Sequence, residues 1–316
     1  MSDDKIIAVV GATGMQGGGL ARAILGAAGG GFKLRALTRN PGADAAQALQ
    51  AAGAEVVSAD LDDEASLLAA FTGAYGAYCV TNFWEHFSPA KEYEQAGRMA
   101  RAAAQAGLSH VIWSTLEDTR RFIPLDDDRM PTLQDRYKVP HYDAKGEANE
   151  LFAKEGVPTT FLQAAFYWDN MINFGMGPKR DGDGQLVLTF PLGDAKLPGI
   201  SGGDVGGCAY GIFGRGTDTV GKTFRIVGAL LSGTEMADRL SQAVAEPVRY
   251  QSVSADAYRG FGFPGAEDLG NMFQAIVEFP APFGSEEEVA ASRELNPGLL
   301  TFDGWLAQNA TKIPLD

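Results

Sequence analysis

Short runs of β-branched and other apolar residues recur along the first half of the chain, separated by longer segments whose apolar residues follow helical spacing. The uninterrupted runs predict strands that are buried on both faces, as in a parallel sheet. The segments between them predict helices with one apolar face. We expect strands at residues 6–10, 33–39, 55–59, 77–81, 110–114 and 159–163, and helices at residues 20–25, 43–52, 64–71, 89–106 and 141–152.

This alternation of strands and helices predicts the fold class. Strand–helix–strand units with right-handed crossovers build a Rossmann-type, doubly wound parallel sheet of the α/β class. After residue 165 the pattern becomes less regular, with short strands expected at 185–190, 222–227 and 248–253 and helices near 204–213, 234–245, 268–278 and 302–308. We therefore predict a Rossmann domain over residues 1–165 and a smaller α/β lobe over residues 166–316, with some later segments returning to the first domain.

Three glycines, Gly11, Gly14 and Gly17, join the first predicted strand to the first predicted helix. In dinucleotide-binding folds one such glycine turns the chain, one lets the backbone approach the pyrophosphate, and one lets helix and strand pack closely. The phosphates then lie at the helix N-terminus, where free N–H groups and the helix dipole favour negative charge. The motif predicts a dinucleotide site with contacts from Gly11, Thr13, Gly14, Met15, Gln16 and Gly17.

The end of the second predicted strand bears on the choice of cofactor. Folds that prefer NAD place an acidic residue there to bind the ribose hydroxyls, whereas a basic residue accommodates the 2′-phosphate of NADP. Arg39 stands at this position, and no acidic residue occurs from Thr38 to Gly42. We therefore predict NADP(H) in preference to NAD(H); the alternative is a solvated arginine at a strand end.

Further cofactor contacts are expected from the other strand ends, because the carboxyl ends of parallel strands share one edge of the sheet. Asp60 follows the third predicted strand and is placed to accept a hydrogen bond from the adenine amino group. The fourth predicted strand breaks at Asn82 and Phe83, so this backbone is expected to line the cofactor channel.

Composition narrows the classes of partner. The 316-residue chain has a formal net charge of -14, which argues against direct binding of nucleic acid or of an anionic membrane. Cys79 and Cys208 lack metal-type spacing and predict buried, reduced thiols; we expect no metal site, including at the acidic residues 126–128. No charged-then-apolar leader precedes Ile6 and no apolar run approaches about 18 residues, so a soluble, cytoplasmic protein is expected. The sequence leaves the oligomeric state open, monomer or homodimer.

Several stretches together resemble the NmrA-like family, a group of atypical short-chain dehydrogenases/reductases. The stretches are the glycine motif and residues 80–85, 141–147, 262–273 and 295–297, and the likeness is greatest to NADPH-sensing members. The resemblance implies a Rossmann domain, a small α/β lobe, and NADP held by the glycine motif and Arg39. It also implies cofactor contacts around the later strand ends, at Asp60, Leu61, Thr81, Asn82, Phe83, Lys145, Phe166 and Tyr167.

The catalytic residues of ordinary short-chain reductases are only partly present. Those enzymes use a tyrosine as acid, a lysine four residues later, and a serine or threonine after the fifth strand. Lys145 is present, and Ser114 and Thr115 are available, but His141 occupies the tyrosine position. Residues four apart share a helix face, so His141 is expected beside Lys145, and Tyr142 lies on roughly the same face. His141 and Tyr142 are alternative proton donors; in a third interpretation both only line the site.

Two hypotheses for function follow. In the first, the chain is a redox or cofactor-responsive regulator with little or no dehydrogenase activity, and the long loop at residues 115–137 responds to NADP(H); from sequence this loop is either a lid or disordered. In the second, it is an NADPH-dependent reductase of a quinone, enone or carbonyl compound. A small apolar substrate or a protein partner fits these hypotheses, and no sequence feature identifies either.

Overall fold

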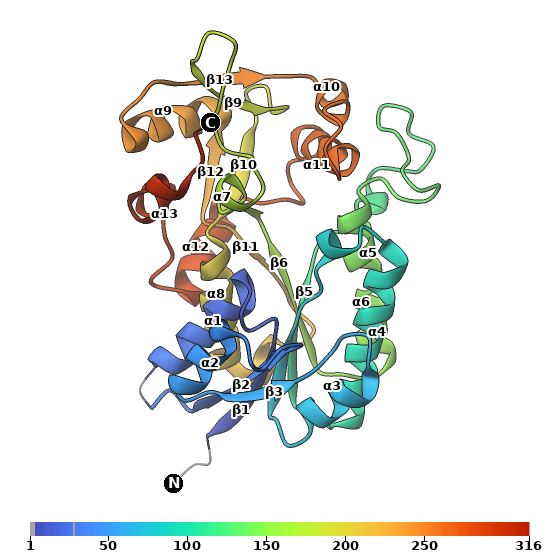
Figure 1. Cartoon of the computed structure of the whole chain (residues 1–316). Helices are drawn as coiled ribbons and strands as arrows, with labels where there is room; N and C mark the ends of the chain where they lie inside the picture. The colour runs from blue at the N-terminus through green and yellow to red at the C-terminus, as the bar shows by residue number, and fades with distance from the viewer. Residues whose placement is uncertain (1–3, 28, 316) are drawn as a thin grey trace.

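A seven-stranded parallel sheet forms the centre of the molecule (Figure 1). The computed structural model describes residues 4–27 and 29–315. The strand order is that of a doubly wound Rossmann-type sheet, which confirms the predicted fold class. In spatial order the strands are β3 (Glu55–Ser58), β2 (Phe32–Thr38), β1 (Lys5–Val10), β4 (Gly76–Cys79), β5 (His110–Thr115), β6 (Thr159–Ala164) and β11 (Thr223–Ile226).

Helices cover both faces of this sheet. Alternate residues of β1 point to opposite faces, so Ile7 and Val9 join one apolar core while Ala8 and Val10 join another. One face is covered by α1 (Met15–Gly26), α2 (Asp44–Ala51), α8 (Gly202–Arg215) and α12 (Glu286–Leu295). The other is covered by α3 (Glu64–Phe71), α4 (Pro89–Gln105), α5 (Pro140–Glu147) and α6 (Asn149–Lys154).

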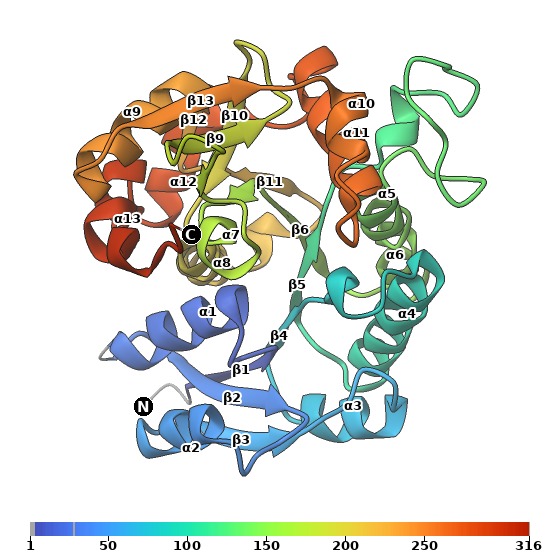
Figure 2. The same cartoon turned by 45° about the horizontal axis from the view of Figure 1, so that its top comes forward.

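The smaller lobe has its own apolar core, and its strands and helices gather at the top of Figures 1 and 2. It contains two three-stranded sheets. These are β12 (Ala229–Ser232), β10 (Lys196–Ile200) and β7 (Phe166–Tyr167), and β13 (Val248–Ser252), β9 (Leu186–Phe190) and β8 (Lys179–Arg180). Its helices are α7 (Asn170–Asn173), α9 (Gly233–Val244), α10 (Ala255–Arg259), α11 (Ala266–Glu278) and α13 (Phe302–Asn309).

Some elements differ from the sequence-based expectation. The helix expected over residues 141–152 is divided at Ala148 into α5 and α6. The strand expected at 222–227 is β11, which pairs with β6 at the edge of the large sheet. The helix expected near 204–213 is α8, which packs against α1. These two elements follow residue 165 and lie within the Rossmann layers, because the chain returns to the first sheet after forming part of the smaller lobe.

Glycines allow α1 and α8 to cross at close range. A Cβ atom on Gly19 would lie 2.0 Å from the Gly203 carbonyl oxygen, and one on Gly206 would lie 2.0 Å from the Leu20 nitrogen. Backbone atoms cannot yield as a flexible side chain can. This crossing therefore depends on small residues from both helices.

We expect Gly206→Ala to lower the free energy of unfolding by about 1–3 kcal/mol, the usual cost of forcing extra atoms into a packed interior. Gly214→Ala is the matched control, because Gly214 lies on the same helix and a Cβ atom there would meet nothing within 4 Å. That change is expected to be neutral or stabilising. Urea unfolding measures both, and equal effects would contradict the prediction.

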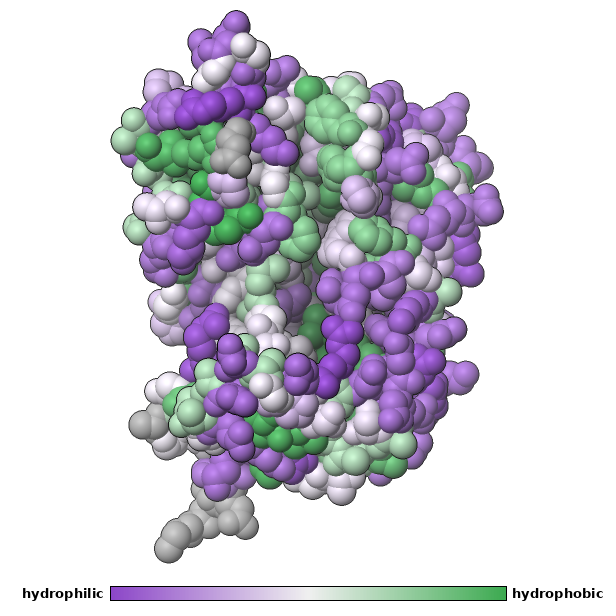
Figure 3. Space-filling model, in the orientation of Figure 1, coloured by the Kyte–Doolittle hydropathy of each residue, from purple (hydrophilic) through white to green (hydrophobic). Residues whose placement is uncertain are grey.

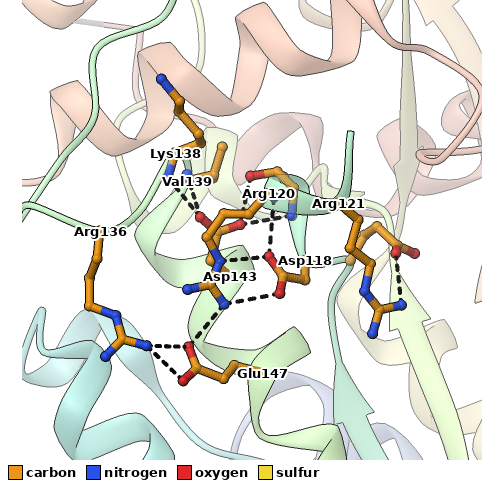
Figure 4. A network of polar contacts seen from close by, with 10 residues as sticks. Asp118, Arg120, Arg121, Arg136, Lys138, Val139, Asp143 and Glu147 are labelled. Carbon is orange, nitrogen blue, oxygen red and sulfur yellow. Dashed lines mark hydrogen bonds and ion pairs between the residues drawn. The ribbon is translucent and has the colours of Figure 1, made fainter. Parts of the chain in front are cut away.

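The segment between β5 and α5 is fastened to α5 at both ends (Figure 4). Thr119, which begins the short 3₁₀ helix η2 (Thr119–Arg121), and the last two residues of the segment bond to the carboxylate of Asp143, which is fully buried. Asp143 accepts from the backbone nitrogens of Thr119 and Lys138, both at 2.8 Å, and of Val139 at 3.0 Å. The two ends of the loop are thereby held together on the helix that carries His141 and Lys145.

Two further observations concern the expectations from composition. Cys79 and Cys208 are both buried and neither forms a disulfide. In residues 4–27 and 29–315, no helix is long and apolar enough to cross a bilayer.

Candidate functional site

The glycine turn ends β1 and begins α1 with its first N–H groups uncapped. Gly11 has a φ of 64°, in the left-handed region, and its carbonyl accepts from the Gly14 nitrogen at 2.8 Å. A Cβ on Gly17 would lie 2.3 Å from the Gly11 oxygen, so only glycine allows this packing. The N-cap, Gly14, has no side chain to bond the free N–H groups, and the first turn of α1 contains no acidic residue. These residues fit a bound pyrophosphate.

The side chain of Gln16 connects α1 to three strands beside the turn. Its Oε1 accepts from the hydroxyls of Tyr78 in β4 and of Ser114 in β5, the latter at 2.8 Å. Its Nε2 donates to the hydroxyl of Tyr167 in β7. The Gln16 amide and the Ser114 hydroxyl are therefore engaged within the protein.

Lys145 forms a buried ion pair with Glu92 of α4, a residue that the sequence analysis missed. The Nζ atom lies 2.5 Å from Glu92 Oε1 and donates to Thr81 at its hydroxyl, 2.6 Å away, and at its carbonyl, 3.1 Å away. Burial raises the pKa of Glu92, but the Lys145 charge, the His86 imidazole 3.5 Å away, and hydrogen bonds from Lys145 and Thr81 outweigh it and bring the pKa down to about 2. A signal was available in the sequence, since Glu92 falls at helical spacing among the buried residues of α4.

This shift predicts an acid-dependent loss of stability. The pKa of Glu92 is lower in the folded protein than its ordinary value of 4.5. The contribution of the ionised carboxylate to the free energy of unfolding is therefore complete above pH 4.5 and is lost as the pH falls toward about 2. We expect unfolding free energy to decline over this range more in the wild type than in a Glu92→Leu, Lys145→Met double variant. Urea titrations at several acidic pH values compare the two; parallel declines would contradict the prediction.

His141 is held by a carboxylate from the smaller lobe, which sequence reasoning also missed. Its Nδ1 lies 2.6 Å from Asp268 Oδ1, and its backbone nitrogen donates to Asp268 Oδ2 at 3.1 Å. Both residues are buried. Asp268 lies in the first turn of α11, where a negative charge is favoured. The two bonds fix the imidazole in place and leave Nε2 as the ring nitrogen able to face a bound molecule.

Aromatic rings surround His141. The Trp84 and Tyr142 rings each lie with centroids 4.8 Å from the imidazole, and the Phe83 ring lies 6.0 Å away. Burial, and to a smaller extent Asp268, raise the pKa of Tyr142 above its ordinary value. A phenol with a raised pKa releases its proton less readily than an ordinary tyrosine does.

Three more of the predicted cofactor-binding residues follow strands of the sheet region, and each makes a different contact within the protein. Asp60 accepts from the Asp62 nitrogen at 2.9 Å, which stabilises the turn after β3 and its neighbour Leu61. Phe166 points its ring into the core of the smaller lobe, 5.9 Å from the Phe190 ring, so its backbone is the part that can reach a cofactor. Arg39 forms an ion pair with Glu85 at 2.5 Å. The roles of these residues in binding stay predictions.

The surface is hollowed in the middle of the face that Figure 3 shows, where a groove has apolar residues gathered along its floor. In the matching view of Figure 1, β5 and β6 lie behind this groove, with α1 and α8 on one side and α4 and α5 on the other. The glycine turn leads directly into α1, and Lys145 and His141 belong to α5, so elements that carry predicted site residues lie on both sides of the groove.

A Rossmann-type sheet with an uncapped glycine turn at its carboxyl edge defines a nucleotide-binding class of protein. Within that class the family is clear, because the model of the NmrA-like family matches residues 3–306. The chain is also 32% identical to an NmrA-like family domain-containing oxidoreductase, FrzB, from Cladobotryum sp, over 90% of this chain and 89% of the relative. The chain therefore belongs to the NmrA-like family.

Solved structures resemble this fold over nearly its whole length. NmrA, a negative transcriptional regulator solved in complex with NADP, aligns with a TM-score of 0.78 at 23% identity, covering 98% of this chain and 96% of that one. The triphenylmethane reductase of Citrobacter sp., complexed with NADP(H), aligns with a TM-score of 0.75 at 21% identity, covering 96% and 99%. At these identities the likeness shows a shared fold.

Proposed function

We propose that this protein is an NADPH-dependent reductase of a flat, apolar acceptor, such as a quinone, an enone or another carbonyl compound. The observation that carries the proposal is the His141–Asp268 pair. The pair supports the proposal because Asp268 fixes the orientation of an imidazole that stands four residues before Lys145, the spacing at which ordinary short-chain reductases have their tyrosine acid. The relative described above is named an oxidoreductase, and two neighbours in fold were solved with NADP or NADP(H), which supports the cofactor.

Each element of the site has a role in this proposal. The glycine turn binds the pyrophosphate and Arg39 the 2′-phosphate. Lys145 would hold the nicotinamide ribose through Nζ, which in this structure contacts Glu92 and the hydroxyl and carbonyl of Thr81. The hydride comes from the reduced nicotinamide of the bound cofactor. In the doubly protonated imidazole, Nδ1–H bonds to Asp268 and Nε2–H is the donor: His141 gives the Nε2 proton to the acceptor oxygen, becomes neutral with Nδ1–H retained, and takes a proton back from solvent.

The aromatic rings near His141 support a flat substrate. The Phe83 and Trp84 rings pack edge to face with centroids 5.5 Å apart, and Phe87 continues the row with its centroid 5.8 Å from Trp84. Phe87 and Phe263 are both partly exposed. A planar, apolar molecule gains both buried area and ring-to-ring contact from such a surface.

The test is a turnover assay on the purified full chain. NADPH is mixed with a panel of quinones, enones and aldehydes, and the loss of its absorbance is followed. Turnover of at least one planar acceptor, lost in Lys145→Ala, is expected. Tight NADPH binding with no turnover of any acceptor would overturn the reductase proposal and favour the second candidate below.

The second candidate is a cofactor-responsive regulator. It is favoured by the attachment of the 115–137 loop, which bonds to α5 through Asp143 and to α11 through Asn271; the Asn271 amide donates to the carbonyls of Pro131 at 2.9 Å and Lys138 at 2.6 Å. A cofactor that moves α5 would move the loop, provided the reduced and oxidised forms differ in affinity for its two positions. Hydrogen exchange of the loop with NADPH and with NADP+ tests this; identical protection would overturn it.

A further inference from the structure

We propose that Glu85 is a specificity-determining residue that competes with the 2′-phosphate for Arg39 and so limits the preference for NADP(H) over NAD(H). The inference rests on the proposed function, because it takes Arg39 as the group that meets this phosphate. Glu85 ends the 3₁₀ helix η1 (Phe83–Glu85), which follows β4 after an interval of three residues. Its Oε1 lies 2.5 Å from Arg39 Nη1.

The Arg39–Glu85 pair spans the adenosine end of the site. Arg39 follows β2 and Glu85 follows β4, and β1 lies between these two strands in the sheet. Neighbouring strands are about 4.8 Å apart, so the pair bridges roughly twice that distance across the carboxyl end of β1. Gly11 begins the phosphate-binding turn at this end. A dinucleotide that runs from the turn toward the ends of β2 and β3 therefore meets the pair.

Glu85 is the carboxylate that forms the ion pair with Arg39. Its hydrogen bond is the largest cause of the raised pKa of Arg39, ahead of Asp60 and Asp62. Asp62 is itself paired with Lys91 at 2.8 Å and Arg98 at 3.4 Å. Among the residues that the structure describes, Glu85 is the acidic residue within ion-pair distance of Arg39.

The two halves of the pair suit the two cofactors. The guanidinium of Arg39 can bind a phosphate, whereas the Glu85 carboxylate can accept from a ribose hydroxyl, as the acidic residue of NAD-binding folds does. For NADP(H) the phosphate must displace Glu85 from Arg39. The pair opens at low cost, because the Arg39 and Glu85 side chains are 67% and 49% exposed and exposed ion pairs contribute about 0–1 kcal/mol.

The experiment is a double-mutant cycle in cofactor affinity. NADPH and NADH are titrated by calorimetry into the wild type, Glu85→Gln, Arg39→Gln and the double variant. We expect Glu85→Gln to raise NADPH affinity about three- to five-fold, which corresponds to the upper range for an exposed pair. NADH affinity should stay unchanged or fall. In the Arg39→Gln background, Glu85→Gln should change NADPH affinity less than about two-fold.

Glu55→Gln is the matched control for loss of one negative charge. Glu55 is also an exposed carboxylate paired with an arginine, Arg35, at 2.8 Å. It is the first residue of β3, so it lies at the amino ends of the parallel strands, away from the carboxyl ends where Arg39 and Glu85 lie. Its change should leave both affinities unaltered. The proposal is overturned if Glu85→Gln alters NADPH and NADH affinity by the same factor, or if its gain persists without Arg39. If the wild type binds NADPH tightly and Glu85→Gln leaves the ratio of NADPH to NADH affinity unchanged, this inference alone is overturned. If the wild type binds neither cofactor, the proposed function is overturned.

Discussion

His141→Asn is expected to lower kcat for the reduction of a planar acceptor by about 100-fold or more, the range attributed to a positioned proton donor. The asparagine amide can still bond to Asp268 near the place of Nδ1, so the contact between α5 and α11 is kept. It carries no group that releases a proton where Nε2 lies. Steady-state kinetics measure the loss, and calorimetry should show NADPH affinity within about two-fold of the wild type.

Tyr142→Phe is the matched control. It keeps the ring that packs 5.7 Å from Phe283 and removes only the hydroxyl, whose raised pKa makes it a poor donor. Its kcat should stay within about three-fold of the wild type. The reverse outcome, in which Tyr142→Phe abolishes turnover and His141→Asn does not, would assign the proton to the phenol and contradict the role of His141.

Local sequence was sufficient to predict the parallel sheet and the glycine turn that follows β1. Residues 6–10 are apolar without interruption because β1 lies between two strands and under helices on both faces, and a polar residue there would lose its water without compensation. Gly11 and Gly17 are likewise local requirements, one for a left-handed φ and one for a close approach within a single turn. The residues that follow each parallel strand then fall on one edge by topology alone.

The partners of the central side chains depend on contacts distant in sequence. Asp268 meets His141 only because α11 of the smaller lobe folds back over α5, and no property of its own segment indicates which residue it will bond. Glu85 similarly reaches Arg39 across β1. The same limit applies to β11, which was expected as a strand but whose place at the edge of the large sheet is decided by pairing with β6. Sequence patterns predict an element and its buried face, whereas its neighbour comes from the assembled fold.

The buried ion pair of Glu92 and Lys145 leads to the largest expected effect on stability. Glu92 is fully buried and Lys145 is 9% exposed, so removing either partner leaves an uncompensated charge in the interior. Glu92→Leu is expected to lower the free energy of unfolding by about 3–5 kcal/mol. Combining it with Lys145→Met should recover most of this loss, because replacing both members of a buried pair by apolar residues is often neutral. Urea unfolding of the single and double variants measures both effects.

Glu94→Leu controls for the substitution itself, since Glu94 lies on the same helix with its side chain 63% exposed. It is expected to change stability by less than about 0.5 kcal/mol, as surface substitutions usually do. A double variant as unstable as Glu92→Leu would mean that the loss comes from the cavity and the hydrogen bonds to Thr81, and that the unpaired ammonium costs little. Recovery in the double variant would instead identify charge burial as the cost. The Rossmann domain would then hold Lys145 in place through the Glu92 carboxylate, whose buried charge is compensated only while the lysine remains beside it.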